Sequence, residues 1–226
     1  MMRHEDDLIL VERSRHWLDD FARRHLDPAL KQHGFSRRGR NWNRRTDDLV
    51  HVLHIQAGRF GPGISGSTGV FAPSIHRIIR GESSPKFVAD HLCQLHTALG
   101  HWGSGLRFEQ VDPHNANVQR VNFDEPTVNA PEVLSAFLKG ASALDEVQSI
   151  DDVWNVLLGR GEQSRWSSGG PSGSREECLA VLAAQSGEKE RAREFLLSAQ
   201  SRTPSTALSI RGPHYQALAD RLGIAF

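Results

Sequence analysis

Cysteines, long apolar stretches and an excess of charge of one sign are all missing from this sequence. Its two cysteines, Cys93 and Cys178, are too few for the disulfide framework of a small secreted domain. No segment approaches the roughly 18 apolar residues that a membrane-spanning helix needs. The first apolar run, residues 8–11, follows three consecutive acids, which is the wrong flank for a secretory signal peptide. These absences predict a cytoplasmic protein that has no membrane partner.

Lysine is scarce as well, with 4 lysines against 23 arginines, and the 27 basic residues balance 27 acidic ones. The zero net charge removes the whole-protein argument for a nucleic acid or an anionic membrane as partner, although a local basic patch stays possible. Since the arginine bias runs along the entire chain, we attribute it to the coding genome. The alternative is that the guanidinium fork is needed for phosphate or carboxylate contacts.

The first half of the sequence predicts a helix followed by an antiparallel sheet. Apolar residues at three- and four-residue spacings indicate a helix in the first thirty residues, and Gly34 supplies its end. The period then changes to two, which predicts strands over residues 35–40, 41–46, 49–56 and 67–71. The connections are too short for parallel crossovers, so neighbouring strands should run antiparallel. Two further strands are predicted over residues 106–111 and 118–123.

The second half is predicted to be mostly helical. Ser84-Pro85 and an apolar stripe predict a helix that runs to about Leu99, and proline starts are predicted at Pro131 and Pro213. Two Ser-x-x-acid pairs have the spacing of capping boxes at the starts of further helices: Ser149 with Asp152, and Ser174 with Glu177.

A Ser/Gly-rich segment at residues 159–174 interrupts the helices and is typical of a linker, although Trp166 within it is expected to dock on the body. The predicted fold is α+β, with an N-terminal helix, a small antiparallel sheet, covering helices and a C-terminal helical piece. We assign residues 1–158 to an α+β domain, 159–174 to the linker, and 175–226 to a helical hairpin plus a terminal helix.

The residues around the first predicted hairpin resemble a known family. A Gly-Phe pair follows a helix, and a basic hairpin then leads into an apolar strand that closes with glutamine. This order is similar to the bacterial domain-of-unknown-function family 4304. The residues that carry the resemblance are Leu30, Lys31, Gly34, Phe35, Arg37, Arg38, Gly39, Trp42, Arg44 and Gln56, followed by Gly69, Val70, Phe71, Cys93, Thr97 and Leu99. This chain departs from the family at Gln94, His96 and Ala98, where the family tends to have His and two Arg. The resemblance implies an α+β fold and no established activity.

Two motifs come close to known ligand sites without completing them. Residues 61–68 have the spacing of a Walker A loop, but Ser67 stands where the phosphate-binding lysine is needed, and a strand is predicted to follow in place of a helix. Four possible zinc ligands crowd one region: His91, Cys93, His96 and His101. Cys93 and His96 would share one face of the predicted helix, but no second Cys/His pair with zinc-knuckle spacing accompanies them. We therefore expect no cofactor and no metal site.

The basic hairpin is the best remaining candidate site. Five arginines fall within the ten residues 36–45 and interleave with Trp42, an arrangement that can pair guanidinium groups with phosphates and stack a base. In the alternative interpretation the arginines pair with acids of nearby helices, and Trp42 is a core residue. Strand alternation places Arg38, Arg40 and Arg44 on one side, with Arg37 and Arg45 on the other, provided that the turn does not shift the register. The candidate binding residues are Arg37, Arg38, Arg40, Trp42, Arg44, Arg45 and Gln56.

No complete catalytic motif is present. The paired acids at residues 47–48 and 151–152 fall at a turn and at a helix start, where acids are expected anyway. We expect a non-catalytic protein that binds another protein or an anionic macromolecule, such as an accessory or immunity-type protein of a bacterium. Two alternatives stay open: a nucleic-acid-binding module that uses the hairpin of residues 36–45, and an enzyme whose active site the sequence does not reveal.

Overall fold

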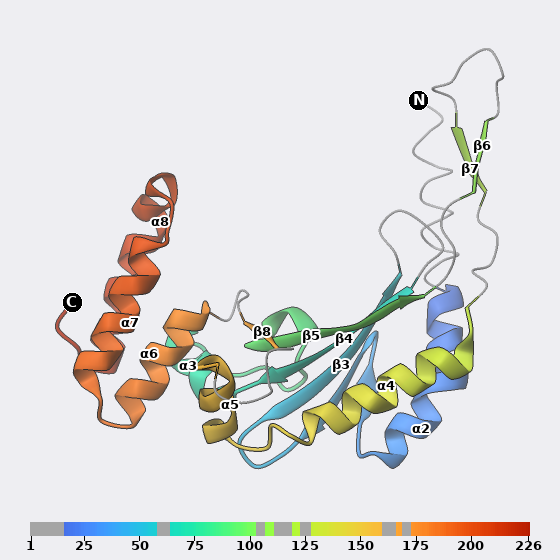
Figure 1. Ribbon diagram of the computed structural model, residues 1–226, viewed down its shortest axis with the longest axis horizontal. Coiled ribbons are helices and arrows are strands. Elements are labelled where there is room, and N and C mark those ends of the chain that lie inside the picture. Colours follow the sequence, from blue (N-terminus) through green and yellow to red (C-terminus); the bar gives the residue numbers. More distant parts are fainter. Residues whose placement is uncertain are drawn as a thin grey trace. The chain divides into compact units, whose positions relative to one another are not determined.

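The structure, a computed structural model, describes residues 16–57, 64–102, 107–110, 119–122, 128–159, 166–168 and 173–226. Its fold is α+β, as the sequence predicts. A six-stranded antiparallel sheet has the strand order β1-β2-β3-β4-β5-β8 (Figure 1). These strands are β1 (Ser36–Arg38), β2 (Asn41–Arg45), β3 (Val50–Ala57), β4 (Ile64–Phe71), β5 (Leu95–Trp102) and β8 (Ser167–Ser168). A separate antiparallel pair joins β6 (Arg107–Gln110) to β7 (Gln119–Asn122), which confirms both predicted strands.

Helices precede, interrupt and follow these strands in the sequence. The chain begins its described part in helix at His16 and continues through a π-helical stretch, η1 (Ala22–Leu26). The remaining helices are α2 (Asp27–Gln32), α3 (Pro73–Arg80), the 3₁₀ turn η2 (Asp90–Leu92), α4 (Ala130–Leu144), α5 (Ile150–Leu157), α6 (Arg175–Gln185), α7 (Lys189–Ser201) and α8 (Ser205–Leu222). Within the described ranges, no helix combines the length and the apolar character needed to cross a membrane.

By their contacts, the residues fall into two compact units. The first unit contains residues 1–42, 53–67 and 98–142, and the second contains residues 43–52, 68–97 and 143–226. Each unit combines three segments that are distant in sequence. The contacts within each unit are therefore largely long-range.

The core of the first unit lies between helices and the sheet. Apolar residues of the N-terminal helix at three- and four-residue spacings, such as Leu18, Ala22 and Leu26, are fully buried, which confirms the predicted periodicity. Trp42 of β2 meets the ring of Phe137 of α4 edge-on at a centroid distance of 5.7 Å. Figure 1 shows α2 and α4 on the same side of the strands. Gly66 lets α4 approach, because a Cβ there would lie 2.9 Å from the Phe137 ring.

The second unit has two apolar clusters. One lies under β3 and β4, where Val52 and Phe71 pack with Val88 and Cys93. The other joins the C-terminal helices, in which α6 packs against α7 and α7 against α8 (Figure 1). Both predicted capping boxes are present: Ser149 caps α5 and Ser174 caps α6, and in each the third residue returns a carboxylate to the cap backbone. Gly187, with φ of +83°, turns the chain between α6 and α7.

The predicted helix over residues 84–99 is wrong. The chain has no regular structure from Ser84 to Ala89, makes the short turn η2, and enters β5 at Leu95. The Gln94 amide donates to the Val70 carbonyl at 2.9 Å, and the Gln94 side chain accepts from the Ala72 amide at 2.7 Å. These contacts with the end of β4 hold the segment extended, and local spacing cannot reveal them.

Two other helix predictions need correction. The last helix starts at Ser205, and Pro213 lies inside it instead of starting it; its predicted end at Gly223 is confirmed by a left-handed φ of +64°. The helix α3 was not predicted, although Pro73 at its first position and buried Ile75 and Ile79 on one face are typical helix signals. Trp166 is buried just before β8, which pairs with β5, and this confirms that it docks.

Candidate functional site

Arg37 of the candidate hairpin is bound inside the first unit. Its guanidinium donates to Asp27 at 3.0 Å and to Asp19 at 3.3 Å, and it lies over the Trp42 ring at 5.4 Å from the centroid. The indole N–H of Trp42 donates to the other oxygen of Asp27 at 2.7 Å. Trp42 itself is only 1% exposed. Arg37 and Trp42 therefore fix the hairpin to the N-terminal helices, as the alternative interpretation of the hairpin predicts.

Arg44 has a comparable role in the second unit. It donates to Asp145 at 2.5 Å and to the Nδ1 atom of His51 at 3.0 Å. The Nε2 atom of His51 lies 2.7 Å from the carbonyl of Val147 and donates to it. Burial lowers the pKa of His51, so the ring is neutral and both of its nitrogens are satisfied. This chain of contacts ties β2 and β3 to the segment after α4.

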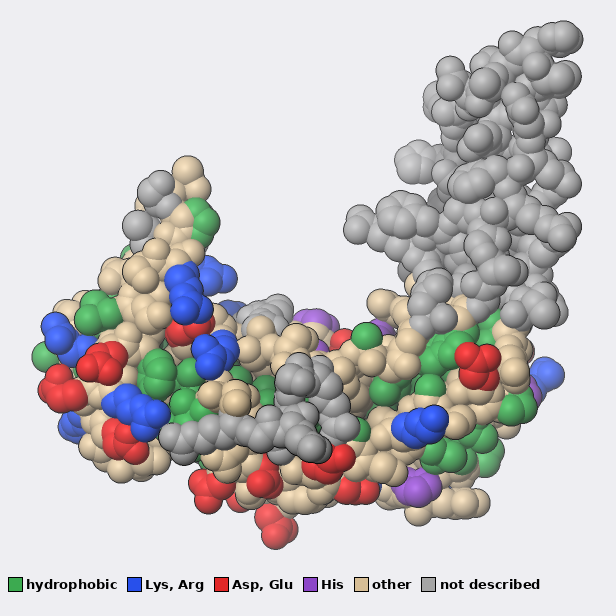
Figure 2. Space-filling view, in the orientation of Figure 1, with side chains coloured by type: hydrophobic (Ala, Val, Ile, Leu, Met, Phe, Trp, Pro, Cys, Tyr) green, Lys and Arg blue, Asp and Glu red, His purple; other side chains and the backbone are tan. Residues whose placement is uncertain are grey.

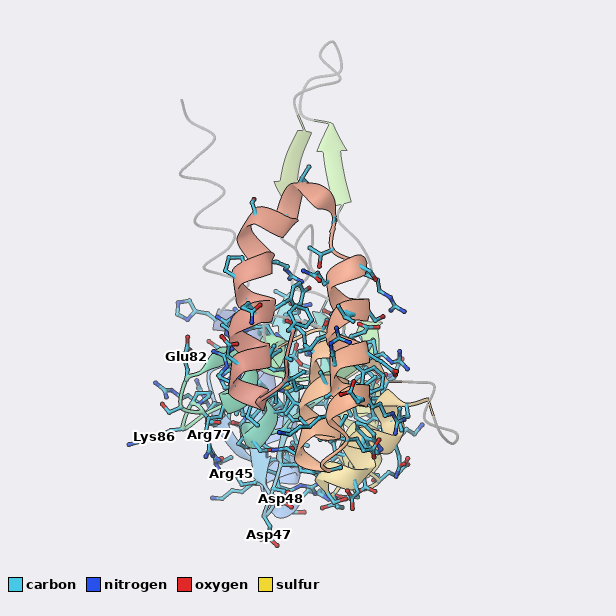
Figure 3. The ribbon with its side chains drawn as sticks, turned by 90° about the vertical axis from the view of Figure 1, so that its left-hand side faces the viewer. Arg45, Asp47, Asp48, Arg77, Glu82 and Lys86 are labelled. Atoms are coloured by element: carbon cyan, nitrogen blue, oxygen red, sulfur yellow. The ribbon has the colours of Figure 1, made fainter. Side chains whose placement is uncertain are left out.

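Arg45 is directed to a backbone, not to an anion. It donates to the carbonyls of Lys86 at 2.5 Å and Pro85 at 3.3 Å. Figure 3 shows its side chain at one end of the second unit among three acids and two further basic residues: Asp47, Asp48, Arg77, Glu82 and Lys86. The two carbonyls make Arg45 a contact between β2 and the segment that follows α3.

The turn between β1 and β2 shifts the register of the hairpin. Gly39 has φ of +61°, a conformation that glycine adopts without strain. Because Arg44 stands two positions after Trp42, it lies on the same face of β2 as Trp42 and Arg37. The prediction that Arg44 shares a side with Arg38 is therefore wrong. Arg40 lies in the turn, half-buried, and its carbonyl accepts from the Ile55 amide at 3.0 Å.

The sheet has a polar face in the first unit, opposite the helices. Leu53 and Leu99 meet α4 at Gly140, and Gly66 meets it at Phe137. Side chains alternate along a strand, so residues one position before or after these face away from α4. This polar sheet face consists of Arg38, His54, Gln56, Ser65 and Ser67, all of which are exposed or half-buried. Arg38 belongs to it because its neighbour Arg37 points to the helix acids.

The polar sheet face contains two of the seven residues proposed from the sequence, Arg38 and Gln56. The other three residues of this face, His54, Ser65 and Ser67, were not predicted as binding residues. Ile64 and Gly66 alternate with Ser65 and Ser67, which is a strand pattern visible in the sequence. The serines were missed because β4 begins at Ile64, three residues before the predicted start.

The cysteines are poor nucleophiles in this structure. Burial, with a contribution from Asp90, raises the pKa of the Cys93 thiol well above its usual value, and burial likewise raises the pKa of Cys178. Cys93 and His96 do not share a helix face. The Nε2 atom of His96 lies 2.6 Å from the backbone carbonyl oxygen of Cys93, so the contact is with the backbone and not with the thiol. In the described part of the chain, no three His, Cys, Asp or Glu side chains are grouped so that they could hold a metal ion. The His101 side chain lies outside it.

The glycine-rich loop lies partly outside the described residues, which resume at Ile64. From there to Phe71 the chain is β4, and this confirms that a strand follows the loop. No helix N-terminus is therefore present at this point to bind a phosphate group.

The fold defines an α+β protein with an antiparallel sheet and a basic hairpin that packs against its N-terminal helices. A family model, described as Domain of unknown function (DUF4304), matches residues 26–140, which is just over half of the chain. The protein belongs to this family, which confirms the resemblance seen in the hairpin. No curated protein and no solved structure was found to match the chain.

Proposed function

We propose that the protein is a non-catalytic module that binds an acidic surface of another protein through the polar sheet face. One observation carries this proposal: two adjacent arginines have opposite environments. Arg37 is bound by two acids and an indole ring, whereas Arg38 points away from them and is exposed. A guanidinium that is presented on a sheet face beside short polar side chains is suited to intermolecular contact, because its planar fork of N–H donors can reach a carboxylate of a partner.

The charge of the N-terminal segment of the first unit is consistent with an acidic partner. Residues 16–42 contain six Lys or Arg and three Asp, and Arg37 binds two of these three acids. Asp20, the third acid, lies 3.1 Å from Arg23 and 3.9 Å from Arg24. Among the described residues of this region, the exposed basic side chains that form no ion pair are Lys31 and Arg38, and Arg38 lies on the polar sheet face. Charge complementarity of this kind increases the rate of association and selects the partner.

The described residues of the polar sheet face include no aromatic ring on which a base could stack, which favours a protein over a single-stranded nucleic acid. Single-stranded nucleic acids are held by bases that stack on exposed aromatic rings. Trp42, the aromatic residue of the hairpin, is buried against Phe137, and the polar sheet face contains no Phe, Tyr or Trp among its five residues. Binding of duplex phosphates by the exposed basic residues is the second candidate, supported by the same charge excess.

In-cell photocrosslinking tests the proposal. A benzophenone amino acid replaces Gln56 on the polar sheet face, and a control replaces Ser135, which is exposed on α4. We expect a discrete protein adduct at position 56 and not at 135, and its loss when Arg38→Glu is added. An adduct that nuclease removes would support the nucleic-acid candidate. Equal adducts at both positions, or none at position 56, would contradict the proposed interface.

A further inference from the structure

The C-terminal helices form an open pocket of about 450 Å³, which lies within the second unit and involves α6, α7 and α8. This volume falls within the range of small-molecule sites in proteins. Its polar lining comes from Ser174, Glu176, Arg202, Thr203, Arg211 and Tyr215. Its apolar lining includes Ala199 and Ala207. The polar sheet face contributes nothing to it, so this pocket is independent of the proposed function.

The floor of the pocket is polar but internally satisfied. Tyr215 is 1% exposed, and its hydroxyl lies 2.7 Å from Oγ1 of Thr203. Both hydroxyls also reach the carbonyl of Ala199, at 3.3 Å from Tyr215 and 3.0 Å from Thr203. Their protons are therefore used within the floor, and the charge offered to a ligand comes from the arginines.

The pocket has one guanidinium more than its acid can neutralise. Glu176 is buried and accepts from Arg202, and Arg175 lies 3.8 Å from the same oxygen. Arg211 is exposed at the pocket and forms no ion pair with any described residue. Figure 2 shows basic side chains around an acidic one beside the start of α6. With Arg202 and Arg211 against Glu176, the lining carries a net charge of one positive unit.

We infer that this pocket binds a small organic anion, a carboxylate or a phosphate monoester with a compact apolar body. The guanidinium of Arg211 matches the planar, two-oxygen edge of either anion. Arg202 lies at the same wall, where its charge is balanced by Glu176. The small side chains of Ala199 and Ala207 leave room for the apolar body.

Titration calorimetry on the full chain tests this inference with three probes of similar size: benzoate, phenyl phosphate and neutral benzyl alcohol. We expect saturable binding of at least one anion and none of benzyl alcohol; the stronger anion identifies the headgroup. Arg211→Gln should weaken binding by about tenfold or more, because a charged hydrogen bond is lost. Ala207→Leu should abolish it by filling the pocket, and Arg193→Gln, on α7 but not among the pocket-lining residues, should leave it unchanged.

Three results would overturn the inference. They are the failure of both anions to bind saturably at millimolar concentration, unchanged affinity in Arg211→Gln, and an equal loss in Arg193→Gln, which would indicate attraction to charge in general. Because Arg211 is exposed, its variant is informative even if Ala207→Leu folds poorly.

Discussion

The hairpin and the C-terminal helices bury opposite members of their ion pairs. In the hairpin the cation is the more protected partner: the Arg37 side chain is 17% exposed, against 30% for Asp27. In the C-terminal helices the anion is protected: the Glu176 side chain is 9% exposed, against 66% for Arg202. Glu177 repeats this pattern with His214 at 2.6 Å.

This difference determines which member of each pair can be lost at low cost. The helix acids that pair with Arg37 reach water, so they can be solvated if Arg37 is removed. Glu176 is covered by the helices, and the loss of Arg202 would leave its buried charge with only Arg175, at 3.8 Å, beside it. The same kind of contact thus has unequal consequences in the two regions.

The largest effect is expected at Trp42, the ring on which Arg37 lies. Trp42→Ala should lower the free energy of unfolding by about 3–5 kcal/mol, because it empties a core site and leaves Asp27 without its indole donor. Urea unfolding measures this loss. Trp42→Phe, which keeps a ring but not the N–H group, should cost clearly less. A Trp42→Ala variant within about 1 kcal/mol of the parent would mean that the hairpin does not depend on this core.

Arg202→Gln tests the C-terminal side of the comparison. We expect a loss of about 2–3 kcal/mol, below the usual cost of breaking a fully buried pair because Arg202 is largely exposed. Glu176→Gln should cost less than Arg202→Gln, and the double variant should recover part of the loss, since no uncompensated anion remains. Additive losses in the double variant would show that the two side chains are not coupled.

The sequence predicts most elements of both regions, and the exceptions have physical causes. Capping boxes at Ser149 and Ser174 are local, so three-residue spacing is sufficient to find them. The segment at residues 84–99 failed because Leu95 and Leu99 fit both a helical spacing and, with Thr97 between them, a strand spacing. Its pairing with β4 is a long-range contact that no local pattern contains.

The candidate site shows the same limit. Five arginines within ten residues were visible in the sequence, but the direction of each depends on the turn at Gly39, which moves Arg44 to the side of Arg37. The pocket of the C-terminal helices was not predicted, since Glu176, Arg202 and Arg211 lie 26 and 9 residues apart and meet only through the packing of three helices.

Acid should weaken the C-terminal helices through Glu177. Burial alone would raise the pKa of this carboxyl, but hydrogen bonds from His214 and Ser174 outweigh it and hold the pKa below its usual 4.5. A depressed pKa gives stability that is complete above the unfolded value and is lost as pH falls through the folded value. The free energy of unfolding should therefore fall below about pH 4.5, and Glu177→Gln should reduce this acid dependence. Glu190→Gln, at an exposed carboxylate, is the control; an identical slope in all three proteins would contradict the role of Glu177.

The most direct test of the division between hairpin arginines is the free energy of unfolding of Arg37→Met beside that of Arg38→Met. The two substitutions are chemically identical and one residue apart, so they differ only in what the side chain contacts. We predict that Arg37→Met lowers the free energy of unfolding by about 1–2 kcal/mol, because the contacts with two acids and the Trp42 ring are lost. Arg38→Met should leave the free energy of unfolding within about 0.5 kcal/mol of the parent. Equal losses, or a larger loss for Arg38→Met, would contradict the assignment of Arg37 to the fold and Arg38 to a partner.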